Sequence, residues 1–179
     1  KVLADVGLVG LPNAGKSTFI SKISNAKPKI ADYPFTTLVP NLGIVKYGNY
    51  NSFVMADIPG LIRGASDGKG LGNQFLRHIE RTKVLVYMVE CIDEKIYKNF
   101  VTLKNELEKH NPELIKRPSL LLLTKIDLIP TELLELEKVS KEIPIIQISS
   151  VSGKNLKEAI QSIAELIQSQ THDFEISSD

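Results

Sequence analysis

The residues of this sequence best suited to chemistry lie in Gly10–Thr18, which reads GLPNAGKST. The segment matches the P-loop pattern G-x-x-x-x-G-K-[ST], and it follows a strand candidate and precedes a helix candidate, as that motif requires. Its glycines let backbone N–H groups turn inward around phosphates, and the start of the helix adds positive charge. We expect Lys16 to reach the β- and γ-phosphates of a nucleotide and Ser17 to bind Mg²⁺. The nucleotide-binding residues predicted here are Gly10, Leu11, Pro12, Asn13, Ala14, Gly15, Lys16, Ser17 and Thr18.

A second motif suited to phosphate chemistry is DIPG, at the end of the strand candidate Ser52–Ala56. A carboxylate there can hold Mg²⁺ through water, and the last glycine N–H can meet the γ-phosphate and respond to its loss. The glycine-rich segment Gly60–Asn73 that follows is typical of a switch that nucleotide orders and hydrolysis releases. The residues predicted to contact the nucleotide or its metal ion here are Asp57, Ile58, Pro59 and Gly60.

A third motif, TKID, follows the apolar run Leu120–Leu123 and could select the base. Asp127 can accept hydrogen bonds from guanine N1 and N2, which adenine cannot donate, while the stem of Lys125 lies along the purine. A buried carboxylate left unpaired by the wrong base discriminates strongly. The later string SSVSG can offer a backbone N–H to guanine O6. The residues predicted to bind guanine are Thr124, Lys125, Asp127, Ser149, Ser150 and Val151.

These motifs sit in an alternation of apolar runs and helical patterns, which predicts a doubly wound α/β fold. The segment Leu42–Asp57 contains a tight GN turn and predicts a hairpin. We therefore expect a mostly parallel six-stranded sheet with one antiparallel edge strand. The strand candidates are Asp5–Val9, Ser52–Ala56, Val84–Val89, Leu120–Leu123 and Ile145–Ile148, and the helical patterns are Ile96–Leu107, Leu156–Ile167 and a segment capped by Thr131, TELLELEKV.

Length and composition indicate one domain, residues 1–170, followed by a tail or linker stub without periodicity, residues 171–179. The formal net charge of +1 gives no reason to expect DNA or an anionic membrane as a partner, and no apolar run approaches membrane-spanning length. The single cysteine, Cys91, is expected to be a small buried residue and suits a reducing, cytoplasmic environment. Because the chain begins with Lys1, we expect a piece of a longer protein, and a monomer as a fragment.

The ordered strings GLPNAGKST, DYPFTTLVPNLG, VMADIPGLI, GLGNQFLRHIERT, TKID and SSVSG resemble the Obg family of GTPases. The resemblance extends from Ala4 to about Ile167 and implies a P-loop NTPase G domain that hydrolyses GTP slowly with Mg²⁺. It also implies binding of GTP and GDP, with ppGpp as a further candidate ligand. The implied roles are large ribosomal subunit assembly and guanine-nucleotide stress signalling, with ribosome contact through domains that this chain lacks.

The segment ADYPFTTLVPN is the expected first switch, in which a threonine hydroxyl completes the Mg²⁺ shell. The motif alone does not choose between Thr36 and Thr37, whereas the family resemblance assigns the role to Thr37. It also implies a nucleotide loop made of Phe35, Thr36, Thr37, Leu38 and Val39. The expected catalytic residues are then Lys16, Thr37 and Gly60, and the expected metal ligands are Ser17, Thr37 and, through water, Asp57.

Three positions depart from related patterns. Thr124 stands where most Obg relatives have asparagine, and we expect it to lose the amide's link to the P-loop and to lower nucleotide affinity. Arg63 replaces an acidic residue in the second switch. Leu61 stands where Ras-like enzymes place the glutamine that orients water, so slow intrinsic hydrolysis is expected.

Several alternatives stay open at this point. The chain could be a GTP-hydrolysing switch or a guanine-nucleotide sensor with negligible turnover in isolation. An ATP-using relative shares the GLPN-x-GKST string but should lack the TKID carboxylate. Asn13 could hold K⁺ beside the phosphates, which makes K⁺ a second candidate cofactor, or it could only shape the loop.

Overall fold

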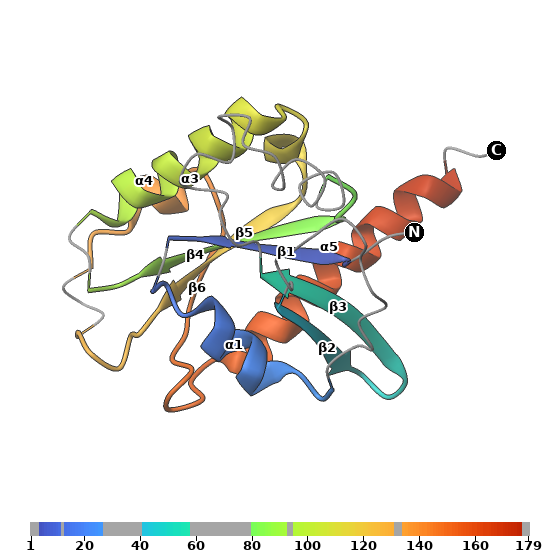
Figure 1. Ribbon diagram of the computed structural model, residues 1–179, viewed down its shortest axis with the longest axis horizontal. Coiled ribbons are helices and arrows are strands. Elements are labelled where there is room, and N and C mark those ends of the chain that lie inside the picture. The colour runs from blue at the N-terminus through green and yellow to red at the C-terminus, as the bar shows by residue number, and fades with distance from the viewer. Residues whose placement is uncertain are drawn as a thin grey trace.

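The computed structural model describes residues 4–11, 13–26, 41–57, 80–92, 95–130 and 134–176. Strands and helices alternate along these residues and form a six-stranded sheet with helices on both faces (Figure 1). The elements are β1 Val6–Gly10, α1 Lys16–Ile23, β2 Asn41–Tyr47, β3 Asn51–Asp57, β4 Val84–Glu90, α3 Ile96–His110, the 3₁₀ turn η2 Leu114–Lys116, β5 Ser119–Thr124, α4 Glu137–Ser140, β6 Ile145–Gln147 and α5 Leu156–Ile176.

The sheet has the order β2-β3-β1-β4-β5-β6, and all neighbouring strands run parallel except β2 and β3. These two form the predicted hairpin, in which Asn41 pairs with Asp57 and Tyr47 with Asn51. Its turn contains Gly48 at φ 59°, a left-handed conformation that glycine adopts without steric cost. The predicted α/β class, with an antiparallel edge strand on an otherwise parallel sheet, is confirmed.

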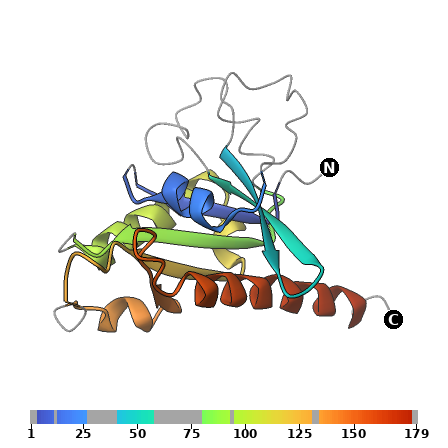
Figure 2. The ribbon, with the colours of Figure 1, turned by 90° about the horizontal axis from the view of Figure 1, so that it is seen from below.

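Helices cover the two faces of the sheet because alternate strand residues point to opposite sides. In β4, Leu85 and Tyr87 join the core under α3, where the rings of Tyr87 and Phe100 meet edge to face at 5.2 Å. Val84 and Val86 join the opposite core, with residues of α1 and α5. Figure 2 shows α5 running along the sheet on that side. Burial on both faces explains why the central strands read as continuous apolar runs.

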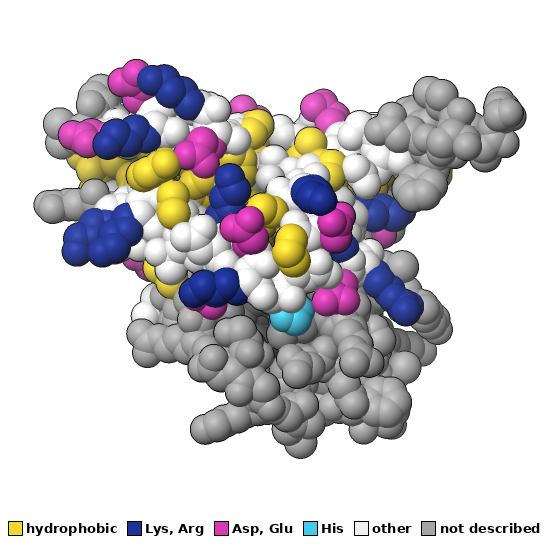
Figure 3. Space-filling model, turned by 90° about the horizontal axis from the view of Figure 1, so that it is seen from above, with side chains coloured by type: hydrophobic (Ala, Val, Ile, Leu, Met, Phe, Trp, Pro, Cys, Tyr) yellow, Lys and Arg dark blue, Asp and Glu magenta, His cyan; other side chains and the backbone are white. Residues whose placement is uncertain are grey.

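The surface that includes α3 carries charges of both signs side by side (Figure 3). Lys104 lies 3.5 Å from Glu142, and the Tyr97 hydroxyl donates to the same carboxylate at 2.7 Å. Such interspersed charges present no single-sign field on this face. None of the helices in the described ranges has the length and apolar character that a membrane span requires.

One expectation about a helix is wrong. The helix expected over TELLELEKV is only α4, because Leu134 and Leu136 instead lie in a non-helical segment and both pack on the core under α3. Thr131 lies outside the described residues. The backbone of residues 171–176 is helical, so α5 continues into the expected tail. The string THDFEI contains no glycine or proline to stop a helix that is already formed.

Candidate functional site

The predicted motifs meet at one edge of the sheet, where the parallel strands end. Gly10 ends β1, Asp57 ends β3 and Thr124 ends β5, while Ser149 follows β6 by two residues. In open α/β sheets, ligands bind at this edge, in the crevice beyond the carboxyl ends of the strands. The topology therefore gathers residues that lie more than a hundred positions apart in the sequence into one place.

The P-loop connects β1 to α1, and two of its residues have left-handed backbones. Gly15 has φ 94° and Asn13 has φ 70°. Asparagine is among the few residues with a side chain that adopt this conformation readily, so loop shape alone gives a reason for Asn13. A Cβ on Gly10 would lie 3.0 Å from the Met88 carbonyl oxygen and 3.1 Å from the Ala14 Cβ. This close approach of backbone to backbone accounts for a glycine at position 10.

Lys16 is held inside the loop that it follows. Its ammonium group donates to the Gly10 carbonyl at 2.9 Å and to the Leu11 carbonyl at 3.3 Å. It also lies 4.0 Å from Asp57 Oδ1, with both side chains largely buried. The lysine charge is therefore oriented by the loop backbone at the place where the motif requires it for phosphate binding.

Asp57 carries an unsatisfied acceptor. Its Oδ1 atom is buried and has no hydrogen-bond partner among the described residues. Burial raises the pKa of Asp57, and the positive charge of Lys16 and the hydroxyl of Ser17 lower it to a smaller extent. An orphaned carboxylate oxygen beside a serine hydroxyl is a donor set that suits Mg²⁺, which prefers oxygen ligands. The residues present at this place fit the expected metal ion.

The TKID segment Thr124–Asp127 at the end of β5, called the guanine-motif loop below, is bonded to the P-loop by two side chains. The Thr124 hydroxyl donates to the Ala14 carbonyl at 2.9 Å and lies 3.4 Å from the Val89 carbonyl. The Lys125 ammonium donates to the Asn13 carbonyl at 3.0 Å and to Glu90 Oε1 at 2.8 Å. Threonine lacks the amide of the family's asparagine, as expected, but its hydroxyl makes a link to the P-loop of its own, which the motif did not predict.

Replacing Thr124 with valine removes this hydroxyl while keeping the branched shape, and leaves the Ala14 carbonyl without that donor. We expect the dissociation constant for GDP to rise about 3- to 30-fold. Titration with a fluorescent GDP analogue measures the change. A matched control is Thr102→Val, because the Thr102 hydroxyl also donates to a backbone carbonyl, that of Lys98 within α3, far from the motifs. Equal affinities in all three proteins would contradict the role of Thr124.

Asp127 is oriented by Ser149. The Ser149 hydroxyl donates to Asp127 Oδ1 at 2.6 Å and accepts from the Ser152 N–H at 3.1 Å. Ser149 is fully buried, whereas Val151 is 80% exposed. A nucleotide could therefore meet Val151 through its backbone more readily than through its side chain. The structure brings Asp127 and Ser149 together as the motifs predict.

Two residues that hold the site were not identified in the sequence. Glu90 ends β4 and pairs with Lys125, and Cys91 contacts the same loop from the next position. The sequence does contain a signal for Glu90. It is a charged residue at the end of an apolar run, and the ends of such strands form the edge of the sheet where the ligand-binding loops lie. The predicted residues that lie outside the described ones are Pro12, Phe35, Thr36, Thr37, Leu38, Val39, Ile58, Pro59 and Gly60, together with Leu61 and Arg63.

Solved structures share this fold. The G domain of the FeoB iron transporter from T. maritima has a TM-score of 0.67 at 22% identity, and the match covers 90% of this chain and 96% of that one. Era from Aquifex aeolicus, crystallised with GDP and AlF₄⁻, has a TM-score of 0.61 at 26% identity, covering 91% of this chain and 56% of Era. These matches show that the fold described above is shared with known G domains.

Sequence relatives are closer. The model of the 50S ribosome-binding GTPase family matches residues 5–125. Proteins named GTPase Obg from Chlorobaculum tepidum and Pelodictyon phaeoclathratiforme are 59% and 60% identical over 88% of this chain. The chain spans about half the length of these curated relatives, since each match covers 47% of the relative. With its P-loop and its guanine motif joined at one sheet edge, this chain belongs to the 50S ribosome-binding GTPase family, alongside proteins named GTPase Obg.

Proposed function

We propose that this chain binds GTP and slowly hydrolyses it to GDP and phosphate, as the nucleotide switch of a longer Obg-type protein. The observation that carries the proposal is the bond from Thr124 to Ala14, which joins the guanine-motif loop to the phosphate cradle. A nucleotide that engages Asp127 with its base and Lys16 with its phosphates would meet two loops already fixed to each other. Such preorganisation lowers the entropic cost of binding.

In this proposal each predicted site residue has a defined task. Lys16 binds the β- and γ-phosphates, and Ser17 and Asp57 would hold Mg²⁺, Asp57 through water. When bound, the ion neutralises charge on the phosphates. Thr37 and Gly60 are proposed to complete this arrangement at the metal ion and the γ-phosphate. Because the side chain of Leu61 can neither donate nor accept a hydrogen bond, the attacking water must be oriented by backbone, by another residue or by a partner.

The wider role proposed for the longer protein is assembly of the large ribosomal subunit and the response to stress, in the cytoplasm. Proteins named GTPase Obg and the family described as 50S ribosome-binding support this proposal. Residues 1–170 would act as the G domain, with residues 171–179 leading out of it, and contact with the ribosome would come through further domains. As a fragment, the chain is proposed to be a monomer that binds GTP, GDP and ppGpp.

A turnover assay tests the central proposal. The chain is incubated with GTP and Mg²⁺, and phosphate release is followed under multiple and single turnover, with ATP as a competitor. We expect slow release that ATP does not inhibit. Tight GTP binding without release would instead support the sensor with negligible turnover, and inhibition by ATP would contradict guanine selection.

The proposal for K⁺ concerns Asn13, whose side-chain oxygen could help to hold the ion beside the phosphates. We expect GTP turnover in KCl to exceed that in NaCl by about tenfold or more, as for one added charge-stabilising contact. Asn13→Gly removes the side chain but tolerates the left-handed backbone at φ 70°, so it should abolish the difference between the salts without losing nucleotide binding. Equal turnover of the unmodified chain in both salts would contradict a role in K⁺ binding, and Asn13 would then serve only to shape the loop.

A further inference from the structure

Cys91, the residue directly after β4, makes two hydrogen bonds to the start of the guanine-motif loop. Its backbone N–H donates to the Thr124 carbonyl at 2.9 Å. Its thiol donates to the Lys125 carbonyl at 3.0 Å. Both bonds cross from the end of β4 to the end of β5, so one residue contacts two consecutive carbonyl groups of the loop that carries Asp127.

The Lys125 backbone needs such support. It has φ 63°, a left-handed conformation that is unfavourable for a residue with a Cβ, and its geometry sets the direction of the chain toward Asp127. The Lys125 carbonyl also accepts the Leu128 N–H at 3.0 Å. The thiol thus ties the Lys125 carbonyl to the neighbouring strand, in addition to the ion pair of the Lys125 side chain with Glu90, whereas the bond from Leu128 lies within the turn itself.

The thiol is suited to donating this bond. Cys91 is 2% exposed. Burial raises the pKa of its thiol, and the negative charges of Asp127 and Glu90 raise it further. A protonated thiol has a hydrogen to donate, whereas a thiolate could not bond to a carbonyl oxygen. The environment of Cys91 therefore favours the form that holds the loop.

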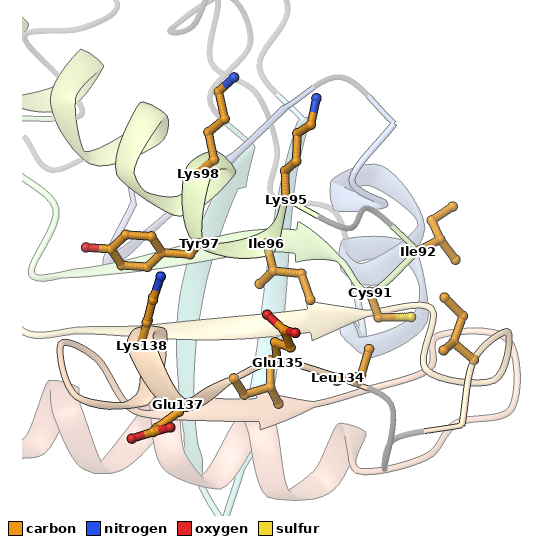
Figure 4. A pocket seen from close by; sticks show the side chains of 12 residues that line it. Cys91, Ile92, Lys95, Ile96, Tyr97, Lys98, Leu134, Glu135, Glu137 and Lys138 are labelled. Carbon is orange, nitrogen blue, oxygen red and sulfur yellow. The ribbon is translucent and has the colours of Figure 1, made fainter.

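Cys91 packs in the core under α3, at the wall of a hollow. The residue lines a hollow of about 1010 Å³ between the start of α3 and the segment that leads into α4. Figure 4 shows Cys91 at one end of this hollow, near Ile96 and Leu134. The bonds to the Thr124 and Lys125 carbonyls are the directional contacts that connect Cys91 to the loop.

We propose that Cys91 is a positioning residue for guanine recognition, whose thiol fixes the Lys125 peptide group so that Asp127 meets the edge of the base. This inference rests on the proposed binding of guanine nucleotides. Cys91 itself does not touch the nucleotide. Its effect should therefore appear in base affinity and base discrimination rather than in the phosphate chemistry.

The test compares Cys91→Ala, which lacks a donor, with Cys91→Ser, which keeps one of similar size. Calorimetric titrations of the 179-residue chain with GDP and with inosine diphosphate, which lacks the 2-amino group, give two dissociation constants for each protein. For Cys91→Ala we expect the value for GDP to rise about 3- to 10-fold and the preference for GDP over inosine diphosphate to fall at least about twofold. Cys91→Ser should recover most of the GDP affinity and most of the preference for GDP over inosine diphosphate.

A matched control separates positioning from general destabilisation. Val45→Ala truncates a fully buried residue of the edge strand β2, at the far side of the sheet. It should lower the unfolding temperature while keeping the preference for GDP. If Cys91→Ala keeps the affinity and preference of the unmodified chain, or if Cys91→Ser binds no better than Cys91→Ala, the positioning role is wrong. Failure of the unmodified chain to prefer GDP would instead overturn the proposed function.

Discussion

Replacing Asp127 with asparagine is expected to weaken GDP binding by about a hundredfold and to make xanthosine diphosphate the better ligand. Guanine presents two N–H donors to the carboxylate, at N1 and N2. Xanthine carries a carbonyl oxygen at position 2 in place of the amino group. A side chain that offers an N–H at that place therefore repels guanine and accepts xanthine.

Ser149 determines which way the new amide faces. Because the Ser149 oxygen accepts from the Ser152 N–H, its hydroxyl hydrogen is directed to Asp127 Oδ1 at 2.6 Å. In the variant that hydrogen again requires an acceptor, so the amide oxygen takes the position of Oδ1. The NH₂ group then occupies the position of the other carboxylate oxygen and faces position 2 of the base, while the second lone pair of the amide oxygen can still accept from N1.

Competition between GDP and xanthosine diphosphate, measured for both proteins, gives the change in preference directly. Asp5→Asn is a matched control, because Asp5 accepts the Val54 N–H beside the opposite end of β1, and an amide oxygen can accept it equally well. The control should keep the preference for GDP. An Asp127→Asn variant that still prefers GDP would show that Asp127 does not read the base.

The sequence identified those residues whose chemistry depends on their own type and local spacing. Lys16 and Asp127 belong to short motifs at strand ends, and the structure brings both to the expected edge of the sheet. The link from Thr124 to Ala14 joins residues 110 positions apart, and it depends on how β5 and the P-loop meet. The motif shows only that position 124 is not asparagine, and this suggested that an amide bond to the P-loop is lost. In the folded structure the Thr124 hydroxyl bonds to the P-loop instead.

Local patterns also failed where tertiary contacts outweighed them. The leucines before α4 suggested a helix, but Leu134 and Leu136 reach the core from an irregular segment, and the residue between them is exposed. In contrast, the α/β class and the antiparallel edge strand followed from strong signals. Long apolar runs predict buried parallel strands, and the GN turn in Leu42–Asp57 predicts an antiparallel partner. The fold class could therefore be predicted because it follows from several long segments together rather than from one tertiary contact.

Replacing Asp57 with asparagine is the second large change, with opposite effects on activity and stability. We expect Mg²⁺-dependent GTP hydrolysis to fall by about a hundredfold or more, because a neutral amide holds the ion poorly. The protein without nucleotide should be at least as stable as the unmodified chain near neutral pH, because the variant no longer buries an ionised oxygen that lacks a hydrogen-bond partner.

The raised pKa of Asp57 gives this prediction a pH dependence with a definite sign. A carboxyl whose pKa is higher in the folded state keeps its proton there to higher pH than in the unfolded chain. The unmodified chain therefore loses stability as pH rises from the ordinary aspartate pKa through the raised one, and Asp57→Asn escapes this loss. Denaturant unfolding near pH 4 and near pH 7, without nucleotide, should show the stability advantage of the variant growing with pH.

Metal binding should follow the opposite trend in the unmodified chain. Since Mg²⁺ needs the ionised carboxylate, its stabilising effect in the presence of GDP should weaken as pH falls through the raised pKa of Asp57. The variant should show no such dependence. If Asp57→Asn lost hydrolysis and also lowered stability without nucleotide, the carboxylate would act chiefly as the partner of Lys16, 4.0 Å away, rather than as a site held open for the metal ion.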